Sequence, residues 1–273
     1  MSFGPNPWLQ QHWDARAAAN FMAGGAGSGM IVAAALAGGP RWSFVLGAAL
    51  VAAGLGAVAL EIGRPLRSLN VYFNPRTSWM SREAIAALVL FACIAAVWAA
   101  LPLARTAATL AALAFLYCQG RILRASKGIP AWREPRIVPL IVATGLAEGS
   151  GLWLLVIGPG AGWPAWLLCA GALLARWVLW RAWRARLATV PRALAAIDRA
   201  GRLYRAGTAL ALAALALALF VPAGAAQSWA LAAAGSSALA AGLWFKFTLV
   251  TRAAFNQGFA LTQLPVRGVR RTR

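Results

Sequence analysis

Acidic residues, histidine and cysteine are scarce in this chain. Of its 273 residues, six are Asp or Glu, three are Cys and one is His. The single histidine, His12, precedes the first apolar run, which excludes the commonest way of holding a haem inside a membrane, between histidines on facing helices. Cys93, Cys118 and Cys169 lie singly inside apolar runs, without the paired spacing of zinc or iron–sulfur ligands, and are interpreted as small core residues.

Nucleotide and metal motifs are absent as well. The sequence has no Gly-x-Gly-x-x-Gly that opens a helix after a strand, no phosphate-binding loop and no metal-ligand box, so it predicts no metal site of its own. If a chain of this composition handles electrons, it must exchange them with a partner protein.

Apolar residues dominate what is present. They make up 61% of the chain, and the mean hydropathy is +0.68, which is more than a soluble domain of this size could bury in one core. A membrane-spanning helix needs about 20 mostly apolar residues. The predicted fold is an all-α integral membrane protein, with an eight-helix transmembrane domain over 1–253 and a C-terminal tail over 254–273. The predicted spans are 15–37, 42–61, 83–101, 104–124, 137–157, 164–183, 202–221 and 228–250.

Positive charge is strongly one-sided. The formal net charge is +20, and every Lys and Arg except Arg41 and Arg105 falls at or near one end of the predicted bundle. This end, which we call the basic end, carries both termini and the connections 62–82, 125–136 and 184–201. Because Lys and Arg are retained on the cytoplasmic side during insertion, we expect both termini to be cytoplasmic in a bacterial inner membrane. The basic connections either serve as topology signals alone or also dock a partner.

The longest polar connection, 61–83, carries four arginines and two of the six carboxylates. One interpretation is helix-end chemistry: Ser78 or Ser81 caps the next helix, and Glu83 lies in its first turn, where a negative charge complements the helix dipole. That interpretation explains less well why a carboxylate, Glu61, closes the preceding apolar run. The alternative is a chemical site within this connection.

Glu148 and Arg176 lie well inside predicted spans. Glu148 falls about 16 Å from the basic end of its helix, near the middle of the bilayer. Either it has a hydrogen-bonded structural role or it handles protons, and Arg176 is a candidate ion-pair partner. In the first span, Gly25 and Gly29 have the Gly-x-x-x-Gly spacing of close helix packing; the other interpretation is room for a flat ligand.

Two further connections at the basic end are patterned. Residues 126–136 are punctuated by prolines and contain one aromatic, Trp132, which we expect to be exposed. This segment suits either a docking surface or an interfacial anchor. Residues 185–201 are predicted to form a short amphipathic helix that starts after Pro191 and lies in the membrane interface.

Three segments together resemble one family. They are similar to the haem-free membrane anchors of molybdenum oxidoreductases, the group that contains the membrane subunits of DMSO reductase and polysulfide reductase. Within that family, the chain looks most similar to the membrane subunits of phenylacetyl-CoA:acceptor oxidoreductases. The segments are Glu61-Ile62-Gly63-Arg64-Pro65 with Ser78-Trp79-Met80-Ser81-Arg82-Glu83, Gly128-Ile129-Pro130-Ala131-Trp132, and Asn256-Gln257-Gly258-Phe259-Ala260 with Leu264-Pro265-Val266-Arg267-Gly268.

The resemblance implies a quinone, ubiquinone or menaquinone, at the end of the bundle where an iron–sulfur subunit docks. A catalytic molybdopterin subunit would sit beyond it, and the iron–sulfur clusters and molybdopterin would belong to these partners. Glu61 stands where the DMSO reductase branch has a histidine tied to quinol binding, and Arg64 is one turn away, so both are predicted to be catalytic. The predicted quinone-binding residues are Glu61, Arg64, Ser78, Trp79, Arg82 and Glu83, and the predicted proton pathway is Glu148 with Arg176.

The predicted docking surface for the iron–sulfur partner combines the connections 62–80 and 125–136 with the tail 254–268, because these are the patterned polar segments of the basic end. Its candidate contact residues are Arg67, Asn70, Arg76, Trp132, Arg133, Asn256, Gln257 and Arg267.

The predicted function is that of a quinone-reducing membrane subunit without a catalytic metal. It would take electrons from a cytoplasmic iron–sulfur subunit during phenylacetyl-CoA oxidation, and a cytosolic, anionic CoA thioester agrees with a cytoplasmic basic end. Three alternatives stay open. They are the anchor of a DMSO- or polysulfide-type reductase that oxidises quinol, a secondary transporter with Glu148 as its proton-coupled site, and a purely structural anchor.

Overall fold

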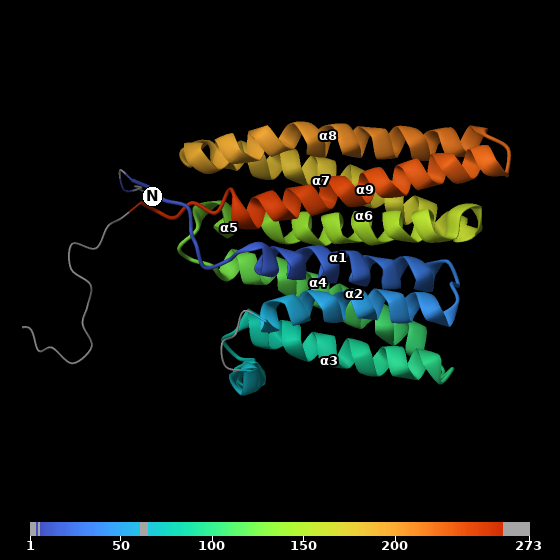
Figure 1. Cartoon of the computed structure of the whole chain (residues 1–273), viewed down its shortest axis with the longest axis horizontal. Helices are drawn as coiled ribbons and strands as arrows, with labels where there is room; N and C mark the ends of the chain where they lie inside the picture. Colours follow the sequence, from blue (N-terminus) through green and yellow to red (C-terminus); the bar gives the residue numbers. More distant parts are fainter. Residues whose placement is uncertain (1–3, 5, 61–64, 259–273) are drawn as a thin grey trace, which may run out of the picture.

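The structure, a computed structural model, describes residue 4 and residues 6–60 and 65–258. In these ranges the chain is all-α, with no strand beyond an isolated bridge between Leu9 and Phe255 (Figure 1). Eight of its helices are long and apolar enough to cross a membrane, as the sequence predicts. The long helices are α1 (Ala15–Leu36), α2 (Arg41–Ala59), α3 (Trp79–Trp98), α4 (Ala104–Ala125), α6 (Ile137–Ile157), α7 (Trp163–Arg184), α8 (Pro191–Phe220) and α9 (Ala225–Thr251), and the short ones are η1 (Pro65–Phe73), α5 (Pro130–Arg133), η2 (Gly158–Ala161) and η3 (Ala185–Thr189).

The long helices form two rings of four. Helix α1 packs on α2 and α4, and α3 packs on the same two helices, which closes the first ring. Helices α6 to α9 close a second ring in the same chain order, and α1 and α6 join the two rings. The apolar window of α1 is 72% buried and that of α6 is 67% buried, against 33% for α2, α3, α7 and α8. The two central helices are therefore the most buried, α4 and α9 follow at 56% and 50%, and the other four face outward with most of their surface.

Glycines allow α1 and α6 to approach closely. A Cβ atom at Gly29 would overlap the backbone of Gly145, and one at Gly149 would overlap the backbone of Gly29 and Met30. Without a hydrophobic driving force between helices in lipid, such contact depends on small residues that let backbones meet. The packing interpretation of the Gly-x-x-x-Gly spacing is confirmed at Gly29.

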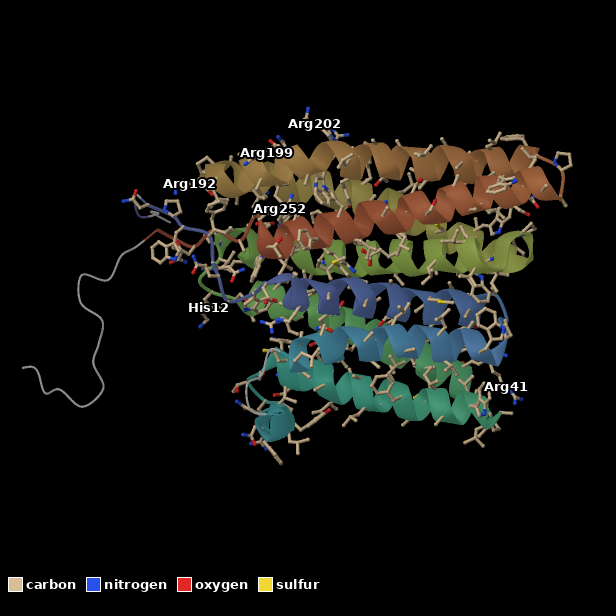
Figure 2. The ribbon with its side chains drawn as sticks, in the orientation of Figure 1. His12, Arg41, Arg192, Arg199, Arg202 and Arg252 are labelled. Carbon is tan, nitrogen blue, oxygen red and sulfur yellow. The ribbon has the colours of Figure 1, made fainter. Side chains whose placement is uncertain are left out.

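The two ends of the bundle differ in charge. Figure 2 shows Arg192, Arg199 and Arg252 at the end where the chain begins, and Arg41 at the other end. At that other end, Arg41 Nη1 donates to the carbonyl oxygen of Trp98 at 3.2 Å, so this arginine fastens the start of α2 to the end of α3. The predicted segregation of charge is therefore present among the described residues.

Residues 185–201 do not form a separate interfacial helix, so that prediction is wrong. Helix α8 begins at Pro191 and continues without a break to Phe220, about 45 Å at 1.5 Å per residue. Its buried face runs on from Ile197 to Tyr204 and into the apolar span, so nothing separates the two parts. The bidentate ion pair between Arg184 and Asp198, at 2.5 and 2.7 Å, fastens this extension to the end of α7.

The N-terminal segment and the start of the tail are hydrogen-bonded to each other. Trp8 N donates to Asn256 Oδ1 at 3.1 Å, Asn256 N donates to the carbonyl oxygen of Trp8 at 3.0 Å, and Gln257 Nε2 donates to the carbonyl oxygen of Lys127 at 3.2 Å. The chain after the predicted boundary at 253/254 thus begins in contact with the bundle as far as Gly258, where the described residues end.

Candidate functional site

A cavity of about 480 Å³ opens at the basic end of the first ring. Its walls are mostly apolar and aromatic, and they come from the segment before α1, from α1 to α4 and from η1. A pocket with mainly apolar walls and few convergent polar groups is the usual form of a small-molecule site. The lining residues are His12, Trp13, Ala17, Asn20, Phe21, Leu55, Val58, Ala59, Leu69, Val71, Tyr72, Met80, Glu83, Ala84 and Ile122.

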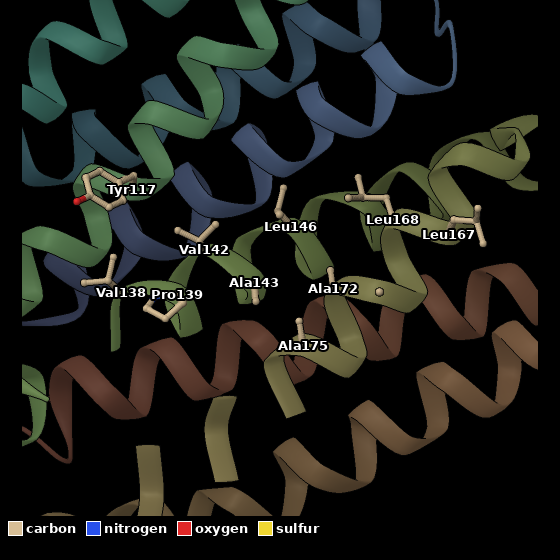
Figure 3. Close-up of a pocket in the computed structure, with 11 residues that line it drawn as sticks. Tyr117, Val138, Pro139, Val142, Ala143, Leu146, Leu167, Leu168, Ala172 and Ala175 are labelled. Atoms are coloured by element: carbon tan, nitrogen blue, oxygen red, sulfur yellow. The ribbon is translucent and has the colours of Figure 1, made fainter. Parts of the chain in front are cut away.

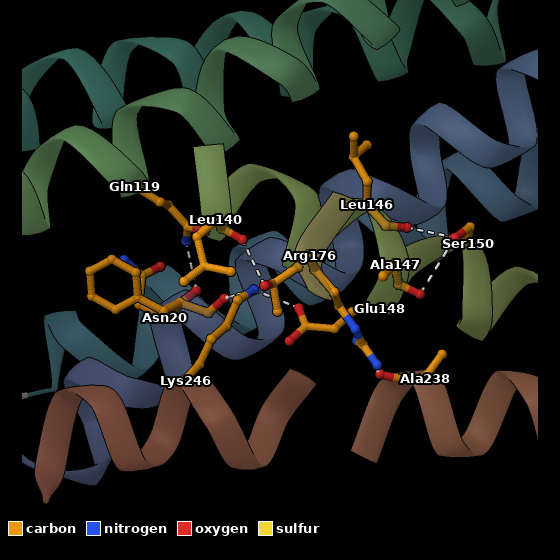
Figure 4. A network of polar contacts seen from close by, with 12 residues as sticks. Asn20, Gln119, Leu140, Leu146, Ala147, Glu148, Ser150, Arg176, Ala238 and Lys246 are labelled. Carbon is orange, nitrogen blue, oxygen red and sulfur yellow. Dashed lines mark hydrogen bonds and ion pairs between the residues drawn. The ribbon is translucent and has the colours of Figure 1, made fainter. Parts of the chain in front are cut away.

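The polar part of the cavity wall is a buried carboxyl group held by amides. Glu83 is 5% exposed, and its Oε1 accepts a hydrogen bond from Asn20 Nδ2 at 3.1 Å. Gln119 Nε2 donates to the carbonyl oxygen of Asn20 at 2.9 Å and fixes this part of α1 (Figure 4). Among the described residues, Glu83 forms no ion pair, and Asn20 Oδ1 and Gln119 Oε1 have no hydrogen-bond partner. A ligand in the cavity would meet a group able to accept or donate a proton.

The position of Glu83 corrects one prediction. Ser78 caps α3 as expected, since its Oγ accepts from Ser81 N at 3.3 Å. Glu83 is the fifth residue of the helix, however, and lies beyond the first turn, where the predicted dipole interaction would operate. It points instead towards α1, because the helical turn after the cap brings its side chain to the buried face.

The other predicted quinone-binding residues support the cavity from outside. Trp79 is held by two arginines, because the guanidinium carbons of Arg82 and Arg121 lie 4.1 and 4.2 Å from its ring centroid. Arg82 also donates to the carbonyl oxygens of Pro75 and Arg76 at 2.7 and 2.8 Å. These contacts hold the chain between η1 and α3 in place, and none of these residues lines the cavity.

Glu61 and Arg64 lie outside the described residues, so their predicted catalytic roles stay predictions. His12, Tyr72 and Met80 line the cavity, but the sequence analysis did not name them as site residues. Met80 lay within the segment already singled out. No pattern in the sequence indicates that His12 and Tyr72, about 60 residues apart in the printed chain, face one space.

A second polar cluster lies deep between the two rings. Lys246 on α9 and Glu148 on α6 are both 0% exposed, and Lys246 Nζ lies 2.5 Å from Glu148 Oε2 (Figure 4). Lys246 Nζ also donates to the carbonyl oxygen of Phe21 in α1 at 2.8 Å. Two glycines leave room for these side chains, because a Cβ at Gly25 would overlap Lys246 Nζ and one at Gly242 would overlap the Glu148 carboxyl. The ion pair therefore joins α1, α6 and α9.

Arg176 does not pair with Glu148, which corrects the sequence-based pairing. Its guanidinium donates to the carbonyl oxygen of Ala238 at 2.9 Å and to Thr208 Oγ1 at 2.8 Å, within the second ring. Lys246 occupies the pairing position instead, since α9 packs directly on α6 and its long side chain reaches the carboxylate. Glu148 Oε1 and Arg176 Nε have no hydrogen-bond partner among the described residues.

The two polar clusters meet at consecutive residues of α1. Asn20 faces Glu83, and the carbonyl of the next residue, Phe21, accepts from Lys246. Polar contacts thus run from the cavity wall through α1 to the ion pair near the centre of the bundle. Glu148, one of the two residues of the predicted proton pathway, belongs to this series of contacts, whereas Arg176 does not.

The predicted docking residues separate into exposed and buried ones. Trp132 is fully buried, and its Nε1 donates to the carbonyl oxygen of Leu249 at 3.0 Å, so its predicted exposure is wrong. The short helix α5 turns the indole inward, where its ring centroid lies 4.9 Å from that of Trp13. Arg133, Asn256 and Gln257 are half-buried, whereas Asn70 and Arg76 are exposed. The side chain of Arg67 and all of Arg267 lie outside the described parts of the chain.

A second hollow, of about 610 Å³, lies on the outer surface between α4, α6 and α7 (Figure 3). Its lining residues are apolar except for Tyr117. Such a groove fits hydrocarbon and offers no carboxyl or imidazole group for proton exchange. The cavity beside Glu83 is therefore the better candidate for chemistry.

Among the described residues, no group of three His, Cys, Asp or Glu side chains is placed to hold a metal ion, and the three cysteines are free. Cys118 and Cys169 are buried, as predicted for core residues, and Cys93 is partly buried. No protein-family model matches the chain, and no curated protein matches its sequence.

Proposed function

We propose that the chain is the quinone-reactive membrane anchor of a molybdopterin and iron–sulfur oxidoreductase. The observation that carries this proposal is the apolar cavity at the basic end, with the buried carboxyl of Glu83 in its wall. A quinone head is flat and apolar and carries two oxygens, so its reduction needs a hydrophobic cleft and a proton donor in contact with it. The cavity offers both.

Each group in the cavity has a task in this proposal. The apolar and aromatic side chains, with Tyr72 and Met80 among them, hold the ring and exclude water. Glu83 exchanges a proton with the quinone oxygen nearest to it, and Asn20 orients the carboxyl through its 3.1 Å hydrogen bond. Reduction to quinol takes two electrons from the partner subunit and two protons from the protein side.

Glu61 and Arg64, which lie outside the described residues, keep a proposed role in the quinone chemistry. Their chain neighbours Leu60 and Pro65 are the last and first described residues around them, and η1 contributes Leu69 and Val71 to the cavity wall. We propose that they supply the second proton or contact the second quinone oxygen. The buried Glu148 and Lys246 pair is proposed to continue the proton pathway inward, with Arg176 as its neighbour in the second ring.

The proposed orientation, partner subunits and substrate depend on the distribution of charge and on the resemblance to the family of membrane anchors. The basic end faces the cytoplasm of a bacterium in this proposal, because Lys and Arg gather there. An iron–sulfur subunit docks on that end, and a molybdopterin subunit beyond it oxidises phenylacetyl-CoA. The quinol-oxidising anchor of a DMSO- or polysulfide-type reductase would use the same cavity in the reverse direction.

A proton-coupled transporter is the second candidate, favoured by two observations. The chain folds as two four-helix rings in the same order, and a buried ion pair lies between them. Parallel repeats with a charged site near the midplane occur in secondary transporters. The transporter differs from the anchor in needing no electron-carrying partner.

Purification of the intact assembly from its native membrane distinguishes these functions. The anchor proposal predicts that extraction of the purified sample yields quinone and that iron–sulfur and molybdopterin chains co-purify in fixed ratio. Quinone without such chains, or neither, would contradict the proposal. A sample that lacks both and takes up solute into vesicles in response to a pH gradient would favour the transporter.

A further inference from the structure

A cationic cavity of about 740 Å³ opens between α7 and α8, away from the cavity described above. On α7 its lining residues are one helical turn apart, from Trp177 through Arg181 to Arg184. On α8, Arg202 and Arg205 face them, one turn apart as well. Figure 2 shows Arg202 on the outer side of the bundle, towards the basic end.

The cavity holds more positive charge than its own side chains balance. Four arginines and one carboxylate, Asp198, line it. Asp198 is fully engaged by Arg184, and Arg205 Nε donates to the carbonyl oxygen of Gly201 at 3.1 Å. Among the described residues, neither the side chain of Arg181 nor that of Arg202 makes a hydrogen bond or an ion pair. Three positive charges thus remain, two of them on guanidinium groups without a partner.

The position of the cavity matches the polar surface of one membrane leaflet. Arg184 is the last residue of α7, and Trp177 lies about 10 Å deeper along the helix. Tryptophan side chains prefer this depth, and Trp180, which also lines the cavity, has an indole N–H without a partner among the described residues. Below this level the same face of α7 continues with an exposed apolar side chain, Leu174, one turn deeper than Trp177.

We infer that this cavity binds the headgroup of an anionic phospholipid of the leaflet at the basic end. The phosphodiester lies between the guanidinium groups of Arg181 and Arg202, and the acyl chains follow the apolar face of α7 towards Leu174. Basic pockets between helices on the cytoplasmic side bind such headgroups in other membrane proteins. The combination of unpaired arginines above and exposed hydrocarbon below fits a lipid better than an acidic protein loop, which would gain nothing from the apolar face. The inference does not depend on the proposed quinone function.

Native mass spectrometry of the purified full chain tests the inference. Phosphatidylglycerol and phosphatidylcholine are titrated separately into the protein in neutral detergent. We expect phosphatidylglycerol to bind at least about 10-fold more tightly, and the double variant Arg181→Gln/Arg202→Gln to lose about 10-fold or more of that affinity. The variant Arg181→Lys/Arg202→Lys, which keeps the charge, should retain most of it.

The matched control is Arg124→Gln/Arg199→Gln, which removes two exposed arginines from the same end of the bundle without touching the cavity. This control should change the affinity for phosphatidylglycerol by less than about 2-fold, because the proposed site depends on arginines inside the cavity and not on the total charge of the basic end. Equal affinities in the two Gln variants would overturn the inference. So would displacement of the lipid by an equal concentration of glycerophosphoglycerol, the headgroup without acyl chains, because the site would then take a soluble phosphate.

If the double variant is not monodisperse on gel filtration, the single variant Arg202→Gln replaces it in the lipid titration. It should lower the affinity for phosphatidylglycerol about 3-fold or more and leave that for phosphatidylcholine unchanged. Loss of an iron–sulfur partner from the Gln variants, with lipid affinity unchanged, would assign the cavity to an acidic protein surface and contradict the lipid site.

Discussion

The buried charges of this protein fall into two kinds at the scale of single residues. Glu148 is matched by Lys246, and the pair ties three helices together. Glu83 is held by one amide hydrogen bond and lies in the wall of a cavity that a ligand can enter. A carboxyl group inside a membrane protein is costly and is by default a functional candidate. We therefore propose that proton exchange belongs first to Glu83, whereas the Lys246 and Glu148 contact joins helices.

Replacement of Glu83 by glutamine tests this assignment. Glu83→Gln keeps the shape and the contact with Asn20 but removes the exchangeable carboxyl proton. Quinone reduction by the assembled complex should slow by about 100-fold or more, the usual effect of losing a positioned acid or base. Assembly and the reduction of an artificial dye at the partner subunits should be unchanged.

The control for that variant is Glu134→Gln, a carboxylate at the basic end that lies outside the cavity and pairs with Arg136. Its quinone turnover should stay within about 2-fold of the parent protein, because it exchanges no proton with the ligand. If Glu83→Gln behaves like this control, the exchange belongs elsewhere. Glu61→Gln then becomes the decisive variant, since the sequence predicts a quinone contact there.

Removal of one partner from the buried ion pair should destabilise the fold. Lys246→Met leaves Glu148 as an uncompensated charge in the interior, a change that costs about 3–5 kcal/mol when a buried pair is broken. The midpoint of unfolding in a sodium dodecyl sulfate titration should therefore fall clearly. The double variant Lys246→Met/Glu148→Gln should recover part of the loss.

Lys127→Met is the matched control for this change, because Lys127 is exposed and makes no ion pair among the described residues. Its midpoint should match that of the parent protein. A Lys246→Met midpoint equal to the control would mean that the pair contributes nothing to stability.

Single residues show what the sequence could and could not indicate. Glu148 was singled out because a carboxylate stands out within an apolar run. Lys246 was not singled out, because a lysine beside Trp and Phe near a helix end is typical of an interfacial anchor as well. Trp132 was expected to be exposed because its loop is rich in proline and charge, but a loop can turn one indole inward when the interior supplies a carbonyl acceptor.

At the scale of helices, the contact between α1 and α6 holds the two rings together. Close packing was one of two interpretations of the small residues in α1. Their partners on α6, Gly145 and Gly149, could be named only from the structure, since sequence spacing does not say which helices meet. The extent of α8 was misjudged for a related reason. Pro191 correctly indicated a helix start, but a polar first half suggested a separate segment.

A single methyl group at the crossing of α1 and α6 should separate them. Gly149→Ala places a Cβ against the backbone of Gly29 and Met30, which cannot rotate away as a side chain could. Forced overpacking of this kind typically costs about 1–3 kcal/mol. The unfolding midpoint in detergent should fall.

Gly56→Ala on α2 is the comparison, because a Cβ there would meet nothing within 4 Å. Its midpoint should be unchanged or slightly raised, since alanine favours helix. Equal midpoints for the two alanine variants would show that the glycine contact does not limit the approach of α1 and α6.

At the scale of the whole molecule, charge is unevenly distributed, and we propose that this asymmetry sets the orientation in the membrane. The first and last described residues lie together at the basic end, where Gly4 N donates to the carbonyl oxygen of Gln257, and by sequence this end holds nearly all Lys and Arg. Composition and apolar runs were enough to predict the eight helices long and apolar enough to span a membrane. The ring order and the cavity required the three-dimensional arrangement, because they depend on which helices pack together.

Reporter fusions should confirm the orientation. Alkaline phosphatase fused after Ser126, between α4 and α5, should be inactive because that connection is expected in the cytoplasm. The same enzyme fused after Gly224, between α8 and α9, should be active in the periplasm. The reverse pattern would place the basic end outside and would exclude a cytoplasmic CoA thioester as the substrate of the complex.

The most direct test of the central claim is photoaffinity labelling with an azidoquinone. The account predicts saturable labelling of peptides that contain Tyr72, Met80 or Trp13, which line the cavity beside Glu83, and loss of that labelling when excess unlabelled quinone is added. Saturable labelling confined to the groove between α4, α6 and α7, or no saturable labelling, would contradict the claim that this cavity is the quinone site.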